Sequence, residues 1–288
     1  MTGPWEGARE ILVAIDPVRE WHLPLAWAAD EAHRHHLPLR LVLAVPPPQH
    51  DPRHVDDTPQ QTALRQAGTA RLEQARDWVR DRHPELAVTD DLRGGFPASV
   101  IAGMARHARM VVLGSRHLGR VAEVLSAGSL VNPVTAQAPC PVVVVGDAPH
   151  TTQQPPYIVA GIDGSAASVT ALQFAFDEAD LCGAAVRAIS VWQPPIVPLH
   201  DGEAAVRAQR ALLAEATAGL SEKYPDVRLH HEVLVGHPVE ELARAAEHAL
   251  AVVVGRRGHG GHTGMRLGST VHGLLRRAHC PVITIPEG

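Results

Sequence analysis

The chain of 288 residues is poor in lysine, in cysteine and in long apolar runs. Lys223 is the only lysine, the formal net charge is −5 and the pI is about 6.4, so nearly all of the positive charge comes from scattered arginines. Nucleic-acid-binding domains usually have a basic patch and a pI above about 9. We therefore expect no nucleic-acid partner.

No apolar run approaches the ~20 residues that a helix needs to span a bilayer. The first six residues, MTGPWE, have neither the charged n-region nor the apolar h-region of a secretory signal peptide. These absences predict a cytoplasmic protein without a membrane partner.

The three cysteines are too few and too scattered for a disulfide framework or a zinc site. Cys140 and Cys280 stand at equivalent positions, just before the last apolar run of each half of the chain. A small buried residue is the favoured interpretation there, ahead of a redox role.

The 19 histidines form no metal-binding pattern. Residues 35–36 and 230–231 are adjacent pairs, and adjacent side chains of a helix or strand do not converge on one metal. His259 and His262 are three residues apart, with no third ligand nearby in the sequence. We therefore expect no metal site.

What the sequence does contain is a long internal repeat. The segment ILVAID at residues 11–16 returns 147 residues later as IVAGID at 158–163, and APCPVV at 138–143 returns as AHCPVI at 278–283. Each copy is long enough to bury its own core, unlike the roughly 20–50-residue units of a solenoid. We therefore predict two homologous domains, residues 1–148 and 156–288, joined by a proline-containing linker.

Each half alternates short β-branched runs with longer Ala-rich amphipathic stretches. This order predicts a parallel sheet with right-handed crossovers and helices on both faces. In the first long helix of the second half, Val169, Leu172, Phe176 and Ala179 fall near one face. The second half is expected to have strands at 157–162, 185–191, 228–235, 251–254 and 282–285, and helices at 168–181, 203–224, 238–248 and 269–277.

Two segments of the second half lead to the carboxyl edge of that sheet, where ligands bind at the reversal of strand order. Asp163 ends the first strand, and the segment 255–269 with six glycines follows the fourth. Glycines let backbone N–H groups approach an anion, and the following helix start adds a positive dipole end. Arg256 and Arg257 could supply charge, although loop arginines are more often solvated. So many glycines disfavour an ordinary strand-to-helix turn.

Two common nucleotide motifs are absent. There is no Gly-x4-Gly-Lys-[Ser/Thr] segment, and Lys223 lies outside any glycine loop. The segment GIDG at 161–164 does not fit the Gly-x-Gly-x-x-Gly fingerprint that follows the first strand of a dinucleotide-binding fold. A phosphate site in this chain would therefore depend mainly on backbone groups.

The second half resembles a domain of the universal stress protein family. The family motif Gly-x2-Gly-x9-Gly-[Ser/Thr] is matched with its spacing by Gly255, Gly258, Gly268 and Ser269. The resemblance covers nearly the whole chain as a tandem pair. The other matching segments are VAGIDGS at 159–165, GHP at 236–238 and HCPV at 279–282.

This resemblance implies two Rossmann-like domains, of the adenine nucleotide alpha hydrolase-like type, each with a five-stranded parallel sheet and helices on both faces. For a copy that carries the motif it also implies binding of ATP, with or without Mg²⁺. The residues implied at the nucleotide are Asp163 and Val191 at the adenosine, and Gly255, Gly258, Gly268 and Ser269 at the phosphates.

The first half departs from the motif. His117 stands where the second glycine belongs, the loop is one residue longer, and Pro17 replaces the glycine after the aspartate, which removes one N–H group. His117 could donate to a phosphate, but a solvated loop histidine is the favoured interpretation. We expect a weaker or empty site there. The residues that could still form it are Asp16, Val45, Gly114, Gly128 and Ser129.

Three functions fit these features. The first is an ATP-binding regulatory module of the stress response, and the second is a slow ATP hydrolase or a phosphoryl or adenylyl transferase. The third is a nucleotide-independent interaction scaffold. Asp163 is the only carboxylate assigned to the crevice, and efficient phosphoryl transfer needs metal ligands and a group that positions the nucleophile. We therefore predict a binding protein without catalytic residues.

Pairing of the two domains is also implied, because family members dimerise through the fifth strand. A covalent linker makes such pairing intramolecular. We expect the apolar runs 142–145 and 282–285 at this junction, and a homodimer of the two-domain chain is a further possibility.

Overall fold

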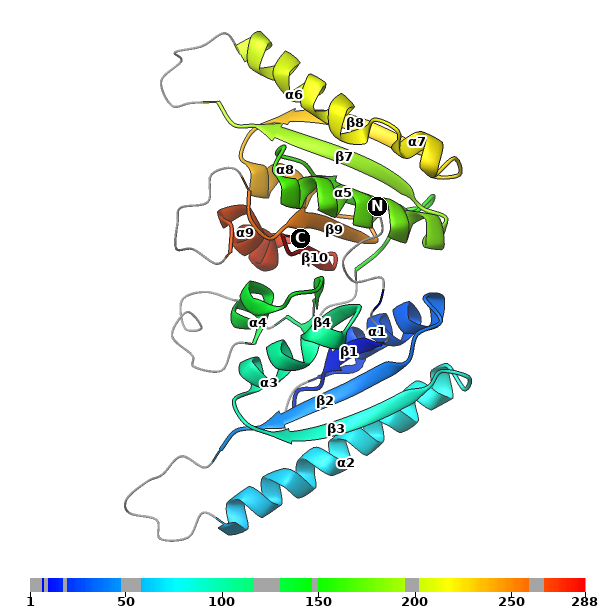
Figure 1. Ribbon diagram of the computed structural model, residues 1–288, viewed down its shortest axis with the longest axis vertical. Coiled ribbons are helices and arrows are strands. Elements are labelled where there is room, and N and C mark those ends of the chain that lie inside the picture. The colour runs from blue at the N-terminus through cyan, green and yellow to red at the C-terminus, as the bar shows by residue number, and fades with distance from the viewer. Residues whose placement is uncertain are drawn as a thin grey trace, which may run out of the picture. The chain divides into compact units, whose positions relative to one another are not determined.

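The computed structural model describes residues 7, 10–17, 20–47, 58–115, 130–146, 150–194, 202–258 and 267–287. These form two compact units, a first unit within residues 10–146 and a second unit within residues 150–287 (Figure 1). Both are α/β structures with parallel strands, so the predicted fold class is confirmed.

The five strands of the first unit lie side by side in the order β3-β2-β1-β4-β5, all parallel. Helices α1 and α2 pack together on one face, and α3 and α4 pack together on the other. The elements are β1 (Ile11–Ala14), α1 (His22–Arg34), β2 (Leu39–Val45), α2 (Thr58–Arg82), β3 (Val88–Gly94), α3 (Pro97–Met104), η1 (Ala105–His107), β4 (Met110–Gly114), α4 (Val131–Gln137) and β5 (Val142–Val145).

The second unit repeats this plan, with parallel strands in the order β8-β7-β6-β9-β10. Helix α5 contacts α6, and α8 contacts α9. The elements are β6 (Tyr157–Gly161), α5 (Ala166–Cys182), β7 (Ala185–Trp192), α6 (Gly202–Thr217), α7 (Leu220–Lys223), β8 (Leu229–Val235), α8 (Pro238–Ala245), β9 (Ala251–Gly255), α9 (Ser269–Arg277) and β10 (Val282–Ile285).

Three details of the predicted helices are wrong. The single helix expected over 203–224 is two helices, because Gly219 takes a left-handed φ of 77° between α6 and α7. Helix α8 ends at Ala245, three residues early. Val169 is 46% exposed, whereas Leu172, Phe176 and Ala179 are fully buried; Ser168 takes the buried place in this first turn of α5.

Burial explains why the central strands read as continuous apolar runs. Every residue of β1 and β6, the middle strands of the two units, is buried, as expected for parallel strands with helices on both faces. The outer strands β3 and β8 contain several exposed residues. The cores of the two units therefore follow the repeat that the sequence shows.

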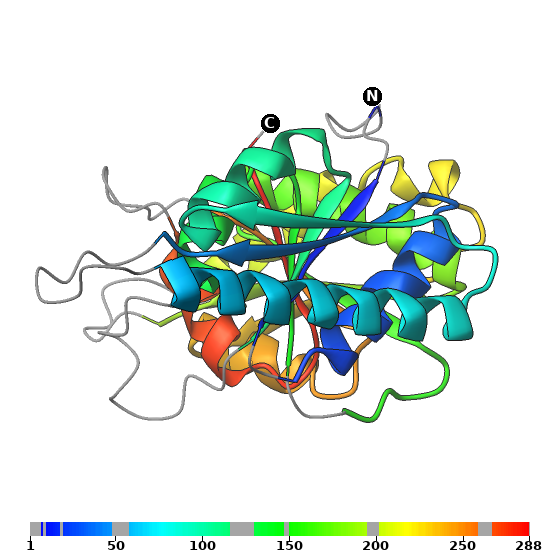
Figure 2. The same cartoon turned by 90° about the horizontal axis from the view of Figure 1, so that it is seen from below.

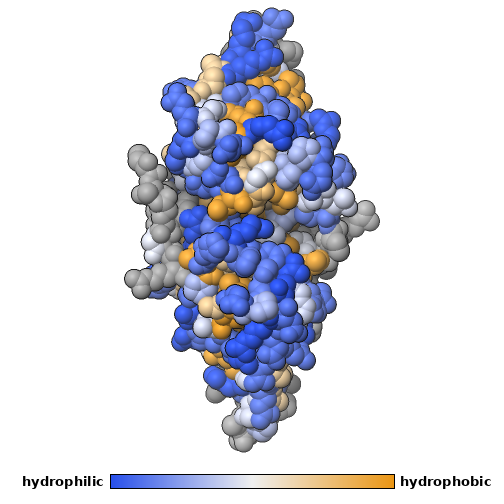
Figure 3. All heavy atoms as spheres, turned by 90° about the vertical axis from the view of Figure 1, so that its right-hand side faces the viewer, coloured by the Kyte–Doolittle hydropathy of each residue, from blue (hydrophilic) through white to orange (hydrophobic). Residues whose placement is uncertain are grey.

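Helix α2 shows how the long helices are held. It runs alongside β2 and β3 (Figures 1 and 2). Leu72, Ala75 and Val79 are its buried apolar residues, and their spacing of three and four places them on one side of the helix. The rest of its surface is mainly polar, as is most of the coloured surface in Figure 3. Among the described helices, none combines the length and the apolar character that crossing a membrane requires.

The two equivalent cysteines are buried, as predicted. Cys140 and Cys280 lie just before β5 and β10 and are 3% and 2% exposed. Burial raises the pKa of the Cys280 thiol to about 12. The thiol is therefore protonated at neutral pH, which disfavours redox chemistry at this residue.

A partly buried cluster of charged side chains links α1 to the end of α2 in the first unit. Asp30 accepts hydrogen bonds from Nε and Nη2 of Arg82, both at 2.8 Å, and its Oδ1 lies 2.7 Å from Nε2 of His83. Burial raises the pKa of Asp30, but these hydrogen bonds outweigh it and bring the pKa below its ordinary value. The ionised carboxylate therefore stabilises the folded unit.

We expect Asp30→Asn to lower the free energy of unfolding at pH 7 by roughly 1 kcal/mol. Because the folded-state pKa is lowered, this contribution is present above the unfolded-state pKa of ~3.9 and is lost as the pH falls through the folded-state value. Urea denaturation at pH 7 and at pH 3 measures the difference. Asp77→Asn is the control, since Asp77 is exposed and its ion-pair distances are 3.9 Å. A difference that grows towards acid pH would contradict this assignment.

Candidate functional site

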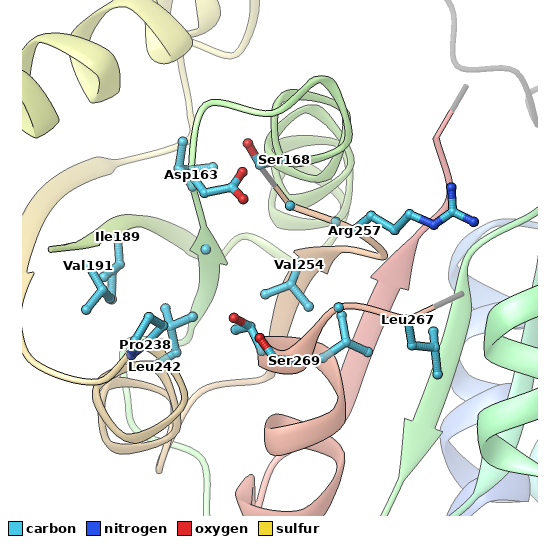
Figure 4. A pocket seen from close by; sticks show the side chains of 17 residues that line it. Asp163, Ser168, Ile189, Val191, Pro238, Leu242, Val254, Arg257, Leu267 and Ser269 are labelled. Carbon is cyan, nitrogen blue, oxygen red and sulfur yellow. The ribbon is translucent and has the colours of Figure 1, made fainter. Parts of the chain in front are cut away.

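The second unit contains a cavity of about 330 Å³ where its strand order reverses, at the carboxyl ends of β6 and β9 (Figure 4). Six of the residues that line it are those that the sequence proposed at the nucleotide: Asp163, Val191, Gly255, Gly258, Gly268 and Ser269. The other lining residues are Gly161, Ile162, Ser168, Ile189, Pro238, Leu242, Val254, Arg257, Leu267, Thr270 and Val271.

The cavity has an apolar side and a polar side. Ile189 and Val191 of β7 lie opposite Pro238 and Leu242 of α8, and they form one end of it (Figure 4). The polar side combines the Asp163 carboxylate with hydroxyl groups and with backbone of the glycine-containing segments. Such a cavity suits a ligand with a flat apolar part and a polar or anionic part.

Asp163 is held in place by the start of α5. Its Oδ1 accepts hydrogen bonds from the backbone N–H of Ser165 at 3.0 Å and from the Ser165 hydroxyl at 2.6 Å. The Ser165 hydroxyl oxygen also accepts from the N–H of Ser168 at 3.2 Å, which makes Ser165 the N-cap of α5. Gly164, with φ of 83°, provides the turn between them. Ser165 therefore both fixes the Asp163 carboxylate and caps α5.

The three motif glycines have different physical roles. A Cβ on Gly255 would lie 2.8 Å from the carbonyl carbon and Cβ of Ala167, so this glycine lets α5 approach the end of β9. A Cβ on Gly258 would lie 2.1 Å from Oδ2 of Asp163, so this glycine leaves room for the carboxylate. At Gly268 the nearest atom is 3.5 Å away and φ is −69°, so an alanine would fit.

Helix α9 begins at the cavity wall. Gly268 is its N-cap and contributes no side-chain cap, and its N–H donates to the carbonyl of Arg256 at 3.0 Å. Ser269, Thr270 and Val271 form the first turn and all line the cavity. N–H groups of a first turn have no acceptor within their own helix, and the helix dipole is positive there. This wall therefore favours an anionic group.

The first unit has a corresponding cavity of about 320 Å³ with different chemistry. Of the residues that the sequence proposed for this site, Asp16 and Gly114 line the cavity and Val45 does not; Val45 is 3% exposed at the end of β2. Gly128, Ser129 and His117 lie outside the described residues. The described lining residues are Ala14, Asp16, Glu20, Trp21, Pro24, Leu113, Gly114, Ser115, Leu130 and Val131.

A later helix start accounts for this difference. Helix α1 begins at His22, six residues after Asp16, whereas α5 begins three residues after Asp163. Glu20 and Trp21 fill the extra length. The ring of Trp21 stacks on that of His22, with 3.9 Å between the ring centroids. It also makes an edge-to-face contact with Trp78, with 6.1 Å between the ring centroids. Hydrogen bonds from the backbone and side chain of His22 lower the pKa of Glu20, so this cavity has a second anionic group at neutral pH.

Sequence reasoning missed Glu20 and Trp21 in the first cavity. In the second it missed Ser168, Ile189 and Leu242, which lie between the matched motif segments. The spacing between the aspartate and the next apolar helical pattern was an available signal for the first two. The others depend on how α5, β7 and α8 pack, which the motif does not encode.

We expect Gly255→Ala to destabilise the second unit, because its Cβ would overlap Ala167 at the tightly packed start of α5. Overpacking of this kind typically costs about 1–3 kcal/mol. The free energy of unfolding in urea measures it, with Gly268→Ala as the matched control because its Cβ makes only ordinary contacts. Equal stability of the two variants would mean that α5 moves away without cost.

Comparison with known proteins gives a consistent result for both units. The sequence model of the universal stress protein family matches residues 7–146 and 157–286. A universal stress protein of Mycolicibacterium smegmatis is 36% identical over an alignment of 291 positions, which covers 96% of each chain. One of Mycobacterium tuberculosis (strain H37Rv) is 33% identical over an alignment of 285 positions, which covers 95% of each chain.

The fold agrees with a solved structure of similar length. The crystal structure of a universal stress protein from Archaeoglobus fulgidus aligns with 99% of this chain and 98% of its own, with a TM-score of 0.73 and 16% identity. Two family matches in tandem and near-complete coverage by relatives above 30% identity lead to one conclusion. The chain belongs to the universal stress protein family.

Proposed function

We propose that the second unit binds an adenine nucleotide, ATP, and that the chain is a regulatory nucleotide-binding module of the stress response. The observation that carries this proposal is a single cavity that combines an apolar slot with the N-terminus of α9 and the motif glycines. The base would lie between Val191 and Leu242, and the phosphates would accept from backbone N–H groups beside Gly268.

The fit depends on shape as well as on charge. Asp163, fixed by Ser165, would accept from the ribose hydroxyls beyond the end of β6. Gly258 leaves the loop backbone open to the cavity, since any Cβ there would overlap the carboxylate. Among the described lining residues Asp163 is the one carboxylate, so Mg²⁺ would enter bound to the phosphates.

The same residues favour binding over catalysis. Efficient phosphoryl transfer requires a metal held beside the γ-phosphate and a group that orients the nucleophile. Asp163 would lie at the nucleoside end instead, with one oxygen engaged by Ser165. Slow hydrolysis remains the alternative, and phosphate release from ATP with and without Mg²⁺ distinguishes it from simple binding.

Calorimetric titration of the full chain with ATP tests the proposal. We expect saturable binding that adenosine reproduces in part, because the apolar slot accommodates the base. No heat of binding, together with no nucleotide released from the purified protein, would instead favour the nucleotide-independent scaffold.

A further inference from the structure

Arg257 stands at the polar end of the cavity of the second unit. It lies between Gly255 and Gly258, whose backbone also lines the cavity. Among the described lining residues it is the only one with a positive charge. Its guanidinium nevertheless extends towards the end of β10, away from Asp163 and Ser168 (Figure 4).

The guanidinium is held there by a weak contact. Nη1 of Arg257 lies 3.5 Å from Oε2 of Glu287, two residues after β10, and the two side chains are 41% and 49% exposed. Nε of Arg257 is buried and makes no hydrogen bond within the described part of the chain. An exposed pair of this length contributes little free energy, so the arginine can leave Glu287 at small cost.

The positions of these charges recur in the other copy of the repeat. Arg116 is the residue equivalent to Arg257, and Asp147 is equivalent to Glu287. Both lie outside the described residues, so the recurrence is a feature of the sequence. A basic residue after the fourth strand and an acidic residue after the fifth are therefore present in both halves.

We propose that Arg257 is a phosphate-specific binding residue that exchanges Glu287 for the ligand. In the structure the guanidinium is paired with Glu287 at the mouth of the cavity. When a phosphorylated nucleotide binds, the side chain turns inwards and donates to a phosphate oxygen, and Glu287 is released. This deepens the proposed nucleotide function, on which it rests.

The exchange is favourable on charge grounds. A phosphate offers several acceptor oxygens and more negative charge than one carboxylate, and arginine binds it through charge-assisted hydrogen bonds. The buried Nε would gain a partner, which it lacks in the described structure. The occupied cavity and the end of β10 would thereby become linked, because one arginine serves both.

The test is a double-mutant cycle on the full chain, with ATP and adenosine titrated by calorimetry. We expect Arg257→Gln to weaken ATP binding about tenfold, which corresponds to about 1.4 kcal/mol, and to leave adenosine binding within about twofold. Glu287→Gln should strengthen ATP binding about twofold to fivefold, as expected for loss of a competing surface ion pair. In the Arg257→Gln background the Glu287→Gln effect should vanish.

Arg277→Gln and Glu240→Gln are matched controls, because these residues form an exposed ion pair of 2.9 Å in the same unit and do not line the cavity. A gain of affinity in Glu287→Gln is not a result that partial unfolding could produce. Unchanged ATP affinity in Arg257→Gln, or an equal Glu287→Gln effect in both backgrounds, would overturn the inference while the nucleotide function stands. A parent chain that binds neither ligand would overturn both.

Discussion

Gly268→Glu should reduce the affinity of the second unit for ATP by on the order of 100-fold or more, whereas Gly268→Ala should leave it nearly unchanged. A Cβ at this position makes only ordinary contacts, the nearest at 3.5 Å, and φ is −69°, so the backbone tolerates either residue. Glutamate, however, would add a carboxylate at the N-cap of α9, from a Cβ that lies 3.9 Å from the backbone N of Gly258. There it would compete with the phosphates for the same donors and repel them, and like charges in a binding site cost several kcal/mol.

Calorimetric titration of the two variants with ATP and with adenosine separates charge from shape. Loss of ATP binding with retained adenosine binding would indicate that the phosphates lie at α9. The urea midpoint of each variant is the folding control. Equal ATP affinity in a folded Gly268→Glu protein would contradict a phosphate site at this helix.

Gly258 provides a second variant at the same site with a different mechanism. Its Cβ would overlap Oδ2 of Asp163, so Gly258→Asp would both displace that carboxylate and add a second one. If Asp163 contacts the ribose, Gly258→Asp should weaken adenosine binding more than Gly268→Glu does. Gly268→Glu therefore reports on the phosphates alone, whereas Gly258→Asp reports on the phosphates and the ribose together.

The fold was readable from the sequence because local and global signals agree. β-Branched runs, Ala-rich helices and the repeat each indicate the same order of elements. Gly219 shows where this reasoning fails, since the helical pattern over 203–224 continues through a residue whose backbone is left-handed. The Val169 prediction fails for another reason: Ser168 lies four residues before the buried Leu172, so a polar residue takes the place on the buried face that the apolar pattern gave to Val169.

The site was predictable only as far as its motif extends. Asp163 and the three motif glycines have fixed spacing, and they lie together in the structure. Ile189 and Leu242 line the cavity because β7 and α8 pack beside it, and no short sequence pattern records that contact. The position of Glu20 and Trp21 depends on the late start of α1, which displaces the whole first turn of the helix.

The two units should therefore differ in nucleotide affinity. The first cavity is nearly as large as the second, about 320 Å³ against about 330 Å³, so size does not separate them. Charge and the start of the first helix distinguish the two cavities instead. Among the described lining residues, Asp16 and Glu20 give the first cavity two carboxylates and no cation, whereas the second has one carboxylate, Asp163, and one cation, Arg257. Pro17 also has no N–H to offer beside Asp16.

We expect titration of the parent chain with ATP to give one strong site, and titration of Gly268→Glu to leave a site at least ~10-fold weaker, or none. Adding Glu20→Gln to Gly268→Glu tests the reason. The Glu20→Gln substitution removes the Glu20 carboxylate from the first cavity. It should strengthen the residual ATP binding there, because one group that repels the phosphates is gone. Glu73→Gln, on the outer part of α2 and away from this cavity, is the control for a change of net charge. Two equal sites in the parent, with one of full strength left in Gly268→Glu, would mean that the late start of α1 and its acidic residue do not impair nucleotide binding.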